Sequence, residues 1–183
     1  MYPVTVVLPT KNEAHNIPHF LKSLPPEVPL LVVDDSSDGT AHIIHIIKTS
    51  RPHNTRVLTC KGNVAQKRQA GLQLVSTSWV LHTDADVVFP RDYFQKILNY
   101  LQKDGFYGPK LSAGGYEGYY RLFSFGQRVL SSLGFPAASG SNLGLRREAA
   151  LAVGGFNTQL NCNEDTDLVL RMVKEGVSPG VGS

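Results

Sequence analysis

Two carboxylates flank a single small residue in this 183-residue sequence: Asp84 and Asp86 lie on either side of Ala85, directly after a short apolar run. Alternate side chains of an extended segment point the same way, so both carboxylates can face one cation. Mg²⁺ and Mn²⁺ prefer oxygen ligands, and phosphate oxygens and water complete their coordination. The pair therefore predicts a site for Mg²⁺ or Mn²⁺. A solvated turn is the competing interpretation, because such short strings are common.

A second acidic pair, Asp34 and Asp35, also follows an apolar run. Segment 34–39 has the residue types that open a calcium-binding loop. The twelfth position of that loop would be His45 in place of a bidentate glutamate, and an apolar strand precedes the segment where a helix is required. The pattern therefore disfavours a calcium loop and leaves the two carboxylates for another ligand or for structural contacts.

The elements that must position these groups are short apolar runs alternating with helical patterns. The runs are 4–8, which Pro9 ends, 30–33, 56–58 and 79–81, and the predicted helices are 17–24, 40–48, 64–75 and about 91–101. Continuous apolar strands alternating with helices predict an α/β fold, with a parallel sheet covered by helices on both faces. Ligands collect beyond the carboxyl ends of such strands. Segments 9–13, 34–38 and 84–86 each follow a strand, so we expect them to meet at one edge of the sheet.

The second half of the chain has a different composition. Glycine and tyrosine are dense between residues 105 and 120, which predicts a loop or irregular strand. Helices are predicted at about 122–133, 147–153 and 166–175, and a glycine- and serine-rich segment, 139–142, separates the first two. Tyrosines 116, 119 and 120 could stack on a sugar ring or pack in the core.

Composition excludes several classes of protein. A hydrophobic fraction of 42% and a charged fraction of 18% describe an ordinary globular chain. The net charge of +3 comes from scattered basic residues without interleaved aromatics, so no nucleic-acid partner is expected. Cys60 and Cys162 lie outside metal-binding spacings, which favours a reduced, cytoplasmic location and leaves one disulfide open. No secretory signal or apolar run of about 18 residues is visible, so peripheral membrane association stays open.

Five short motifs occur in chain order: PTKNE, VVDDSSDGT, KRQAGL, TDAD, and GGF followed by NEDTDLVLR. Together they resemble family 2 glycosyltransferases over nearly the whole chain. The resemblance implies the GT-A fold, with a Rossmann-like, mixed but mainly parallel sheet. It also implies one domain, 1–183, in which 1–104 bind a nucleotide sugar and 105–176 face the acceptor. Family members continue beyond this point, so residues 177–183 would be a tail, truncated or artificially added.

The resemblance also implies a set of donor-binding residues. They follow the first, second and fourth strands, with one basic residue on the third helix: Pro9, Thr10, Glu13, Asp34, Asp35, Arg68, Asp84, Ala85 and Asp86. Asp35 or Asp34 would contact the base or ribose, and Arg68 would lie near the donor. Asp84 would bind the ribose or the metal, and Asp86 would be the main metal ligand.

Two acidic residues near the C-terminus match the acidic pair of the family. The resemblance implies that Asp165 is the catalytic base and that Glu164 helps to shape the acceptor site. The alternative is that these residues, with Asp167, only favour the first turn of a helix, a description that fits Asp167 best. With one candidate base and no obvious second nucleophile, we expect direct attack and inversion of the anomeric configuration.

The implied activity is transfer of a sugar from a UDP- or GDP-linked donor to a hydroxyl of a saccharide or lipid-linked acceptor, with Mg²⁺ or Mn²⁺ as the cofactor. Two alternatives remain. A sugar nucleotidyltransferase would show a glycine-rich loop with a basic residue after the first strand, and segment 9–13 contains no glycine. A non-catalytic nucleotide-binding domain would keep the cleft without turnover. The sequence predicts no oligomeric state.

Overall fold

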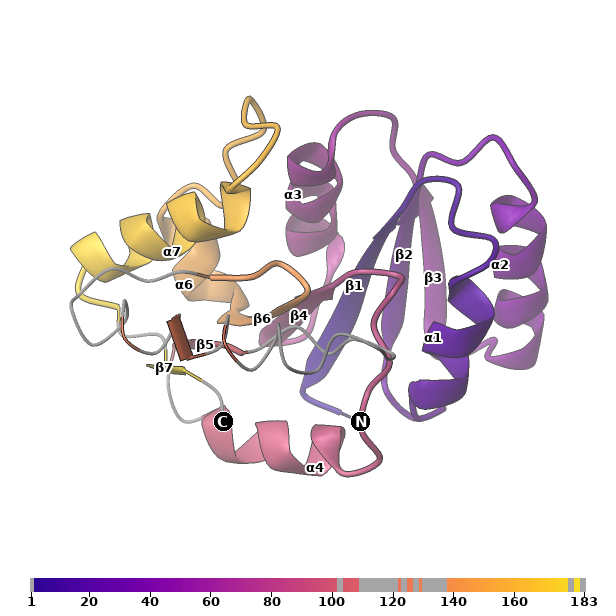
Figure 1. Ribbon diagram of the computed structural model, residues 1–183, viewed down its shortest axis with the longest axis horizontal. Coiled ribbons are helices and arrows are strands. Elements are labelled where there is room, and N and C mark those ends of the chain that lie inside the picture. Colours follow the sequence, from indigo (N-terminus) through magenta and orange to yellow (C-terminus); the bar gives the residue numbers. More distant parts are fainter. Residues whose placement is uncertain are drawn as a thin grey trace.

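The computed structural model describes residues 2–101, 104–108, 122, 125–126, 129, 138–177 and 180–181. Within these ranges one sheet has the strand order β3-β2-β1-β4-β6-β5-β7 (Figure 1). Its strands are β1 (Val4–Thr10), β2 (Leu30–Asp34), β3 (Thr55–Thr59), β4 (Trp79–Thr83), β5 (Gly105–Tyr107), β6 (Asn142–Arg146) and β7 (Gly180–Val181). Strands β3, β2, β1 and β4 are parallel, β6 is antiparallel to β4 and β5, and β7 is parallel to β5. The predicted mixed, mainly parallel sheet is confirmed.

Helices cover both faces of this sheet, as predicted (Figure 1). The helices are α1 (Ile17–Ser23), α2 (Thr40–Ser50), α3 (Val64–Leu74), α4 (Tyr93–Ile97) with the 3-10 turn η1 (Leu98–Tyr100), α6 (Arg147–Ala152) and α7 (Glu164–Lys174). Side chains of β1 alternate between two cores: Val6 and Leu8 pack with α1, α2 and α4, and Val7 packs with α3, α6 and α7. Burial of both sheet faces explains why the parallel strands are continuously apolar.

Helix α3 approaches the sheet closely because it contains Gly71. A Cβ atom at this position would lie 2.4 Å from Cγ1 of Val7 on β1. A side chain would therefore push α3 away from the strand that it covers. This close packing fixes the first turn of α3 beside the carboxyl end of β1, where the polar segment 9–13 begins.

Several predicted boundaries were wrong. Pro9 does not end β1, because the strand continues to Thr10, which is in register with Asp34. The predicted helix 91–101 is a short α-helix followed by a 3-10 turn. Within segment 177–183, which was predicted to be a tail, Gly180–Val181 forms β7 of the sheet; the interpretation of the segment as truncated or artificially added stays a prediction.

Strand β6 was missed, and other predictions in this half lie beyond the described residues. Only residues 122, 125, 126 and 129 of the predicted helix 122–133 are described, and they are helical. The tyrosine-rich stretch 109–121 lies outside the described residues. The backbone N–H of Gly108 donates to the carbonyl of Asn142 at 3.1 Å, so these two residues, which flank segment 109–141, are in contact beside β5 and β6. In the described part of the chain, every helix is too short or too polar to cross a bilayer.

Candidate functional site

A cleft of about 450 Å³ lies at the carboxyl ends of β1 and β4. Its walls come from the segment after β1, the start of α3 and the segment after β4: Pro9, Thr10, Lys11, Glu13, Gly62, Asn63, Val64, Lys67, Asp84, Ala85 and Asp86. Six of the predicted donor-site residues therefore meet here: Pro9, Thr10, Glu13, Asp84, Ala85 and Asp86. The other predicted residues, Asp34, Asp35, Arg68, Glu164 and Asp165, do not line this cleft.

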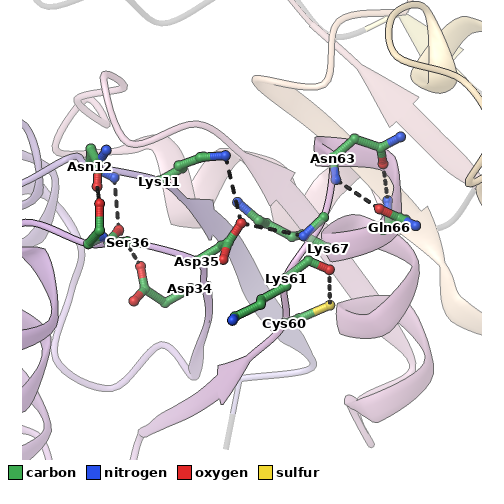
Figure 2. A network of polar contacts seen from close by, with 12 residues as sticks. Lys11, Asn12, Asp34, Asp35, Ser36, Cys60, Lys61, Asn63, Gln66 and Lys67 are labelled. Atoms are coloured by element: carbon green, nitrogen blue, oxygen red, sulfur yellow. Dashed lines mark hydrogen bonds and ion pairs between the residues drawn. The ribbon is translucent and has the colours of Figure 1, made fainter.

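Asp34 holds the polar loops together. Its side chain is buried, and its Oδ1 accepts hydrogen bonds from Thr10 Oγ1 at 2.7 Å and from Ser36 Oγ at 2.6 Å. Ser36 Oγ in turn accepts the backbone N–H of Asn12 at 2.8 Å (Figure 2). These contacts fix the end of β1 against the loop after β2. The position of Asp34 therefore gives it a structural role, and the predicted contact with a base or ribose does not follow from it.

The neighbouring Asp35 lies between two lysines at one side of the cleft (Figure 2). Its Oδ2 accepts the backbone N–H of Gly62 at 3.4 Å and lies 3.8 Å from Lys11 Nζ.

Lys67 is 3% exposed, and its Nζ donates to the carbonyl of Thr10 at 2.9 Å. Burial lowers the pKa of the Lys67 ammonium, and the charge of Asp35 opposes that shift. Lys67 is a cleft residue that sequence reasoning missed; its only signal was a basic pair in the first turns of a helix.

The first turn of α3 opens onto the cleft and is firmly capped. Asn63 Oδ1 accepts the backbone N–H of Gln66 at 2.9 Å, and Gln66 Oε1 accepts that of Asn63 at 2.8 Å, which is a capping box. Asn63 Nδ2 also donates to the carbonyls of Thr158 and Leu160. A helix N-terminus favours a nearby anion, because its dipole is positive there. This wall of the cleft is therefore suited to phosphate groups.

Arg68 lies behind the cleft and joins two of the predicted site residues. The guanidinium is buried, and its Nη2 donates to Asp84 Oδ1 at 2.9 Å. Its Nη1 forms an ion pair with Glu164 Oε1. Glu164 is itself buried in this pair, and its predicted part in shaping the acceptor site stays a prediction. Arg68 contacts the carboxylates around the cleft and does not line it.

Asp165 and Asp167 lie in the same turn of α7 but make different contacts. The half-buried Asp165 accepts the backbone N–H of Gly140 through Oδ2 and that of Thr166 through Oδ1, both at 2.6 Å. Asp167 forms an ion pair with Arg171 one turn later, at 2.7 Å. Asp167 thus matches the predicted stabilisation of a helix turn, whereas the contacts of Asp165 fix the direction of its carboxylate.

A buried histidine on β4 was also missed by sequence reasoning. His82 is fully buried, and its ring packs against Phe156 with 4.7 Å between centroids. Neither ring nitrogen has a hydrogen-bond partner among the described residues. Burial, together with the charge of Arg68, holds the pKa of His82 well below its usual value. The neutral ring thus belongs to the core behind Asp84.

The carboxylates at the cleft fit a cation that is shared with a ligand. The side chain of Asp84 is 36% exposed, with Oδ1 bonded to Arg68, and Asp86 is exposed at the cleft. In the ranges that the structure describes, no group of three or more His, Cys, Asp or Glu residues could hold a metal. Mg²⁺ commonly takes one or two carboxylates and completes its shell with phosphate oxygens and water. The donor set therefore fits Mg²⁺ or Mn²⁺ bound together with a phosphate.

These features define a class of protein. A mainly parallel sheet covered on both faces, with a helix N-terminus, a buried lysine and two carboxylates at the strands' carboxyl ends, is typical of α/β nucleotide-binding domains. The model of the family "Glycosyl transferase family 2" matches residues 5–153, and the chain belongs to that family.

Curated and solved proteins are similar to this chain over nearly its whole length. A pre-mycofactocin glycosyltransferase of Mycobacterium tuberculosis is 26% identical over 193 residues, which cover 94% of this chain and 39% of that relative. The mannosyltransferase PcManGT from Pyrobaculum calidifontis, solved in complex with GDP-Man and Mn²⁺, has a TM-score of 0.77 at 24% identity. Residues 1–349 of S. aureus TarS, solved in complex with UDP-GlcNAc, have a TM-score of 0.69 at 21% identity.

The aligned regions cover 98% of this chain and 54% of the mannosyltransferase, and 92% of this chain and 52% of the TarS fragment. The chain therefore spans about half the length of these solved structures and 39% of the mycobacterial relative. At these identities the solved structures show the GT-A fold.

Proposed function

We propose that this chain is the donor-binding and catalytic part of a nucleotide-sugar-dependent glycosyltransferase that uses Mg²⁺ or Mn²⁺. One observation carries the proposal: a single cleft places Asp84 and Asp86 opposite Lys67 and the first turn of α3. This arrangement offers oxygen ligands to a cation and positive groups to a diphosphate. The similar mannosyltransferase binds GDP-Man and Mn²⁺ and TarS binds UDP-GlcNAc, which supports a GDP- or UDP-linked donor.

The residues of the cleft have distinct roles in this proposal. Asp86 and the free oxygen of Asp84 would hold the cation, which when bound neutralises charge on the leaving diphosphate. Lys67 and the N-terminus of α3 would bind the phosphates from the opposite wall. Thr10, fixed by its hydrogen bond to Asp34, would shape the floor. Together these groups would orient the sugar-phosphate bond and stabilise the charge that develops when it breaks.

Asp165 is the proposed general base. Its carboxylate is oriented by the N–H groups of Gly140 and Thr166, and each oxygen keeps a lone pair for an acceptor hydroxyl. Removal of the hydroxyl proton during attack typically contributes about 10² to 10⁴-fold in rate. We propose a saccharide or lipid-linked acceptor. We also propose an inverting reaction, because Asp165 is the one candidate base that we identify among the described residues. A product that retains the anomeric configuration of the donor would overturn the inverting mechanism.

The experiment that tests the function has a binding arm and a turnover arm. Calorimetry with UDP and with GDP, each with and without Mn²⁺, measures whether nucleotide binding requires the cation. Release of nucleotide from UDP-glucose, UDP-GlcNAc and GDP-mannose measures turnover. We expect Asp86→Asn to remove the Mn²⁺ dependence. Asp92→Asn is the matched control, because Asp92 is an exposed aspartate that pairs with Lys96 on α4.

The outcomes separate the alternatives. Mn²⁺-dependent nucleotide binding with nucleotide release supports a glycosyltransferase. Binding without turnover of any donor, in the presence of simple sugar acceptors, would support a non-catalytic nucleotide-binding domain. Absence of nucleotide binding with and without Mn²⁺ would contradict the proposal.

A further inference from the structure

The guanidinium of Arg68 connects two segments that are far apart in the sequence. It projects from α3 and is only 4% exposed. One nitrogen donates to Asp84 at the end of β4, and the other forms an ion pair with Glu164, the first residue of α7. Glu164 directly precedes Asp165. The buried guanidinium of Arg68 thus contacts a carboxylate of the cleft, Asp84, and Glu164, the residue before the proposed base.

Backbone packing ties the same guanidinium to the carboxylate of Asp165. A Cβ atom at Gly140 would lie 2.0 to 2.3 Å from Nη1, Cζ and Nη2 of Arg68, so the backbone of Gly140 lies directly against the guanidinium. The N–H of Gly140 donates to Asp165 Oδ2 at 2.6 Å. Arg68 is therefore linked to Asp165 through Glu164 along the chain and through Gly140 across the fold.

The position of Arg68 depends on its two carboxylates. Its Nε has no hydrogen-bond partner among the described residues. One positive charge is therefore shared between Asp84 and Glu164. In a buried setting such charge pairs interact strongly, and loss of one partner leaves the other uncompensated. A change of charge at Asp84 must then alter how firmly Arg68 holds Glu164.

We propose that Arg68 is a positioning residue that couples occupancy of the cleft to the placement of Asp165. A cation bound at Asp84 would attract the negative charge of this carboxylate, so that the carboxylate would interact less strongly with Arg68. The guanidinium then interacts more strongly with Glu164, which fixes the first turn of α7 and the carboxylate of Asp165 against Gly140. The proton acceptor is thereby ordered when the donor is bound. This inference rests on the proposed function, because it assumes that ligands of the cleft engage Asp84.

Amide hydrogen exchange of the whole protein measures this coupling directly. The amides of Gly140 and Thr166 both donate to Asp165, so their exchange rates report how firmly its carboxylate is held. The probe is Mn²⁺ with UDP or GDP, whichever binds the unmodified protein. Coupling between two sites typically corresponds to about 5- to 150-fold. We expect exchange of both amides to slow by about fivefold or more on addition of the probe.

A variant at Glu164, which contacts Arg68 from α7 and does not line the cleft, separates coupling from binding. Glu164→Gln keeps Arg68 and Asp84 but removes the charge that holds α7. We expect it to lose the slowed exchange of Gly140 and Thr166 and to lower kcat. Because coupling between two sites is reciprocal, its affinity for the probe should fall by no more than the coupling factor that is lost. Asp167→Asn is the matched control, because it removes one charge from the same helix turn without touching Arg68.

Substitution of Arg68 completes the test and guards against misfolding. Arg68→Lys keeps the charge but not the two-pronged geometry, and should retain only part of the slowed exchange. The double variant Arg68→Gln with Glu164→Gln leaves no uncompensated charge at Glu164, so it should stay folded while the coupling is lost.

Slowed exchange of Gly140 and Thr166 that persists unchanged in Glu164→Gln would overturn the positioning role, even if the unmodified protein binds nucleotide and turns over a donor. Failure of the unmodified protein to bind nucleotide with Mn²⁺ would instead overturn the proposed function, and this inference with it.

Discussion

Two acidic pairs lie at the carboxyl ends of two parallel strands of the same sheet, and their side chains make different contacts. Asp34, the last residue of β2, is 7% exposed and accepts hydrogen bonds from Thr10 and Ser36. Asp84 and Asp86, after β4, line the cleft, and Asp84 is 36% exposed. Asp34 therefore holds the walls of the site in place, whereas Asp84 and Asp86 face the cleft. Position at the carboxyl end of a strand is therefore not enough to assign a carboxylate a role in binding.

The neighbouring residue types explain the difference. Asp34 is followed two residues later by Ser36, and the adjacent strand ends in Thr10, so two hydroxyl donors lie within reach. Asp84 is followed by Ala85, which has no side-chain donor, and Asp84 pairs with the guanidinium of Arg68 from behind the cleft. A carboxylate surrounded by neutral donors becomes part of the framework. A carboxylate beside a small apolar residue keeps an oxygen for an external cation.

The largest expected effect concerns the exposed pair. Asp86→Asn should lower Mn²⁺-dependent turnover roughly 10³-fold, because metal stabilisation of the leaving group is worth several kcal/mol and about 1.4 kcal/mol is tenfold in rate. Its free energy of unfolding should change by less than about 1 kcal/mol, as is usual at exposed positions. Steady-state kinetics and chemical denaturation measure the two quantities. Unchanged turnover in Asp86→Asn would contradict the role of Asp86 in metal binding, and with it the difference proposed between the two acidic pairs.

Substitution of the buried Asp34 should instead affect stability. Asp34→Asn replaces a charged acceptor of two hydroxyl donors, and hydrogen bonds to charged groups contribute about 1.5 to 3 kcal/mol. We expect a loss of about 2 to 3 kcal/mol in the free energy of unfolding. Denaturation by urea measures this loss, and Asp35→Asn, at the less constrained neighbour, is the control. If Asp34→Asn left stability unchanged and abolished nucleotide binding, Asp34 would have to be reassigned to the ligand.

The strand that carries the exposed pair should be sensitive to acid. His82 stays neutral in the folded protein because its pKa is held well below 6.5, whereas the unfolded chain takes up a proton below that pH. The unfolded state then binds more protons, so stability falls as the pH drops below 6.5, by about 1.4 kcal/mol per pH unit for one full proton. The other histidines are exposed. Urea denaturation between pH 7 and 5 should therefore show that the free energy of unfolding falls with decreasing pH, and that it falls less steeply in His82→Leu. An equal pH dependence in the two proteins would contradict this account.

The smallest effect is expected at Lys11, the exposed partner of Asp35. Its side chain is 65% exposed and its Nζ lies 3.8 Å from the carboxylate. Exposed ion pairs contribute about 0 to 1 kcal/mol. Lys11→Ala should change the free energy of unfolding by less than about 0.5 kcal/mol, and this small change should decrease further as salt screens the pair. A larger loss that persists at high salt would show that Asp35 belongs to the framework with Asp34.

The fold of the first half could be predicted because its strands are apolar on both faces and alternate with amphipathic helices. The same regularity brought Pro9, Thr10, Glu13 and segment 84–86 to one cleft. Strand β6 could not be predicted, since it contains Asn142 and a glycine. That residue, Gly144, is needed because a Cβ there would lie 2.2 Å from the ring of Phe106.

The role of Arg68 was beyond sequence reasoning for a different reason. Its ion pair with Glu164 spans 96 residues, and no local pattern encodes such a contact. Local sequence marked both residues as polar and could not show that they would be buried together. The structural contact of Asp34 was beyond local sequence in the same way, because its hydroxyl donor Thr10 is 24 residues away in the chain.

The hydrogen bond between Gly108 and Asn142 has a consequence for how proteins of this shape diversify. Gly108 and Asn142, the residues joined by this bond, lie beside the paired strands β5 and β6 and flank segment 109–141. Loop closure becomes only slowly more costly with length, so a segment of another length or composition could connect the same two residues. Relatives could therefore differ in this segment while the half of the chain that forms the cleft stayed as it is.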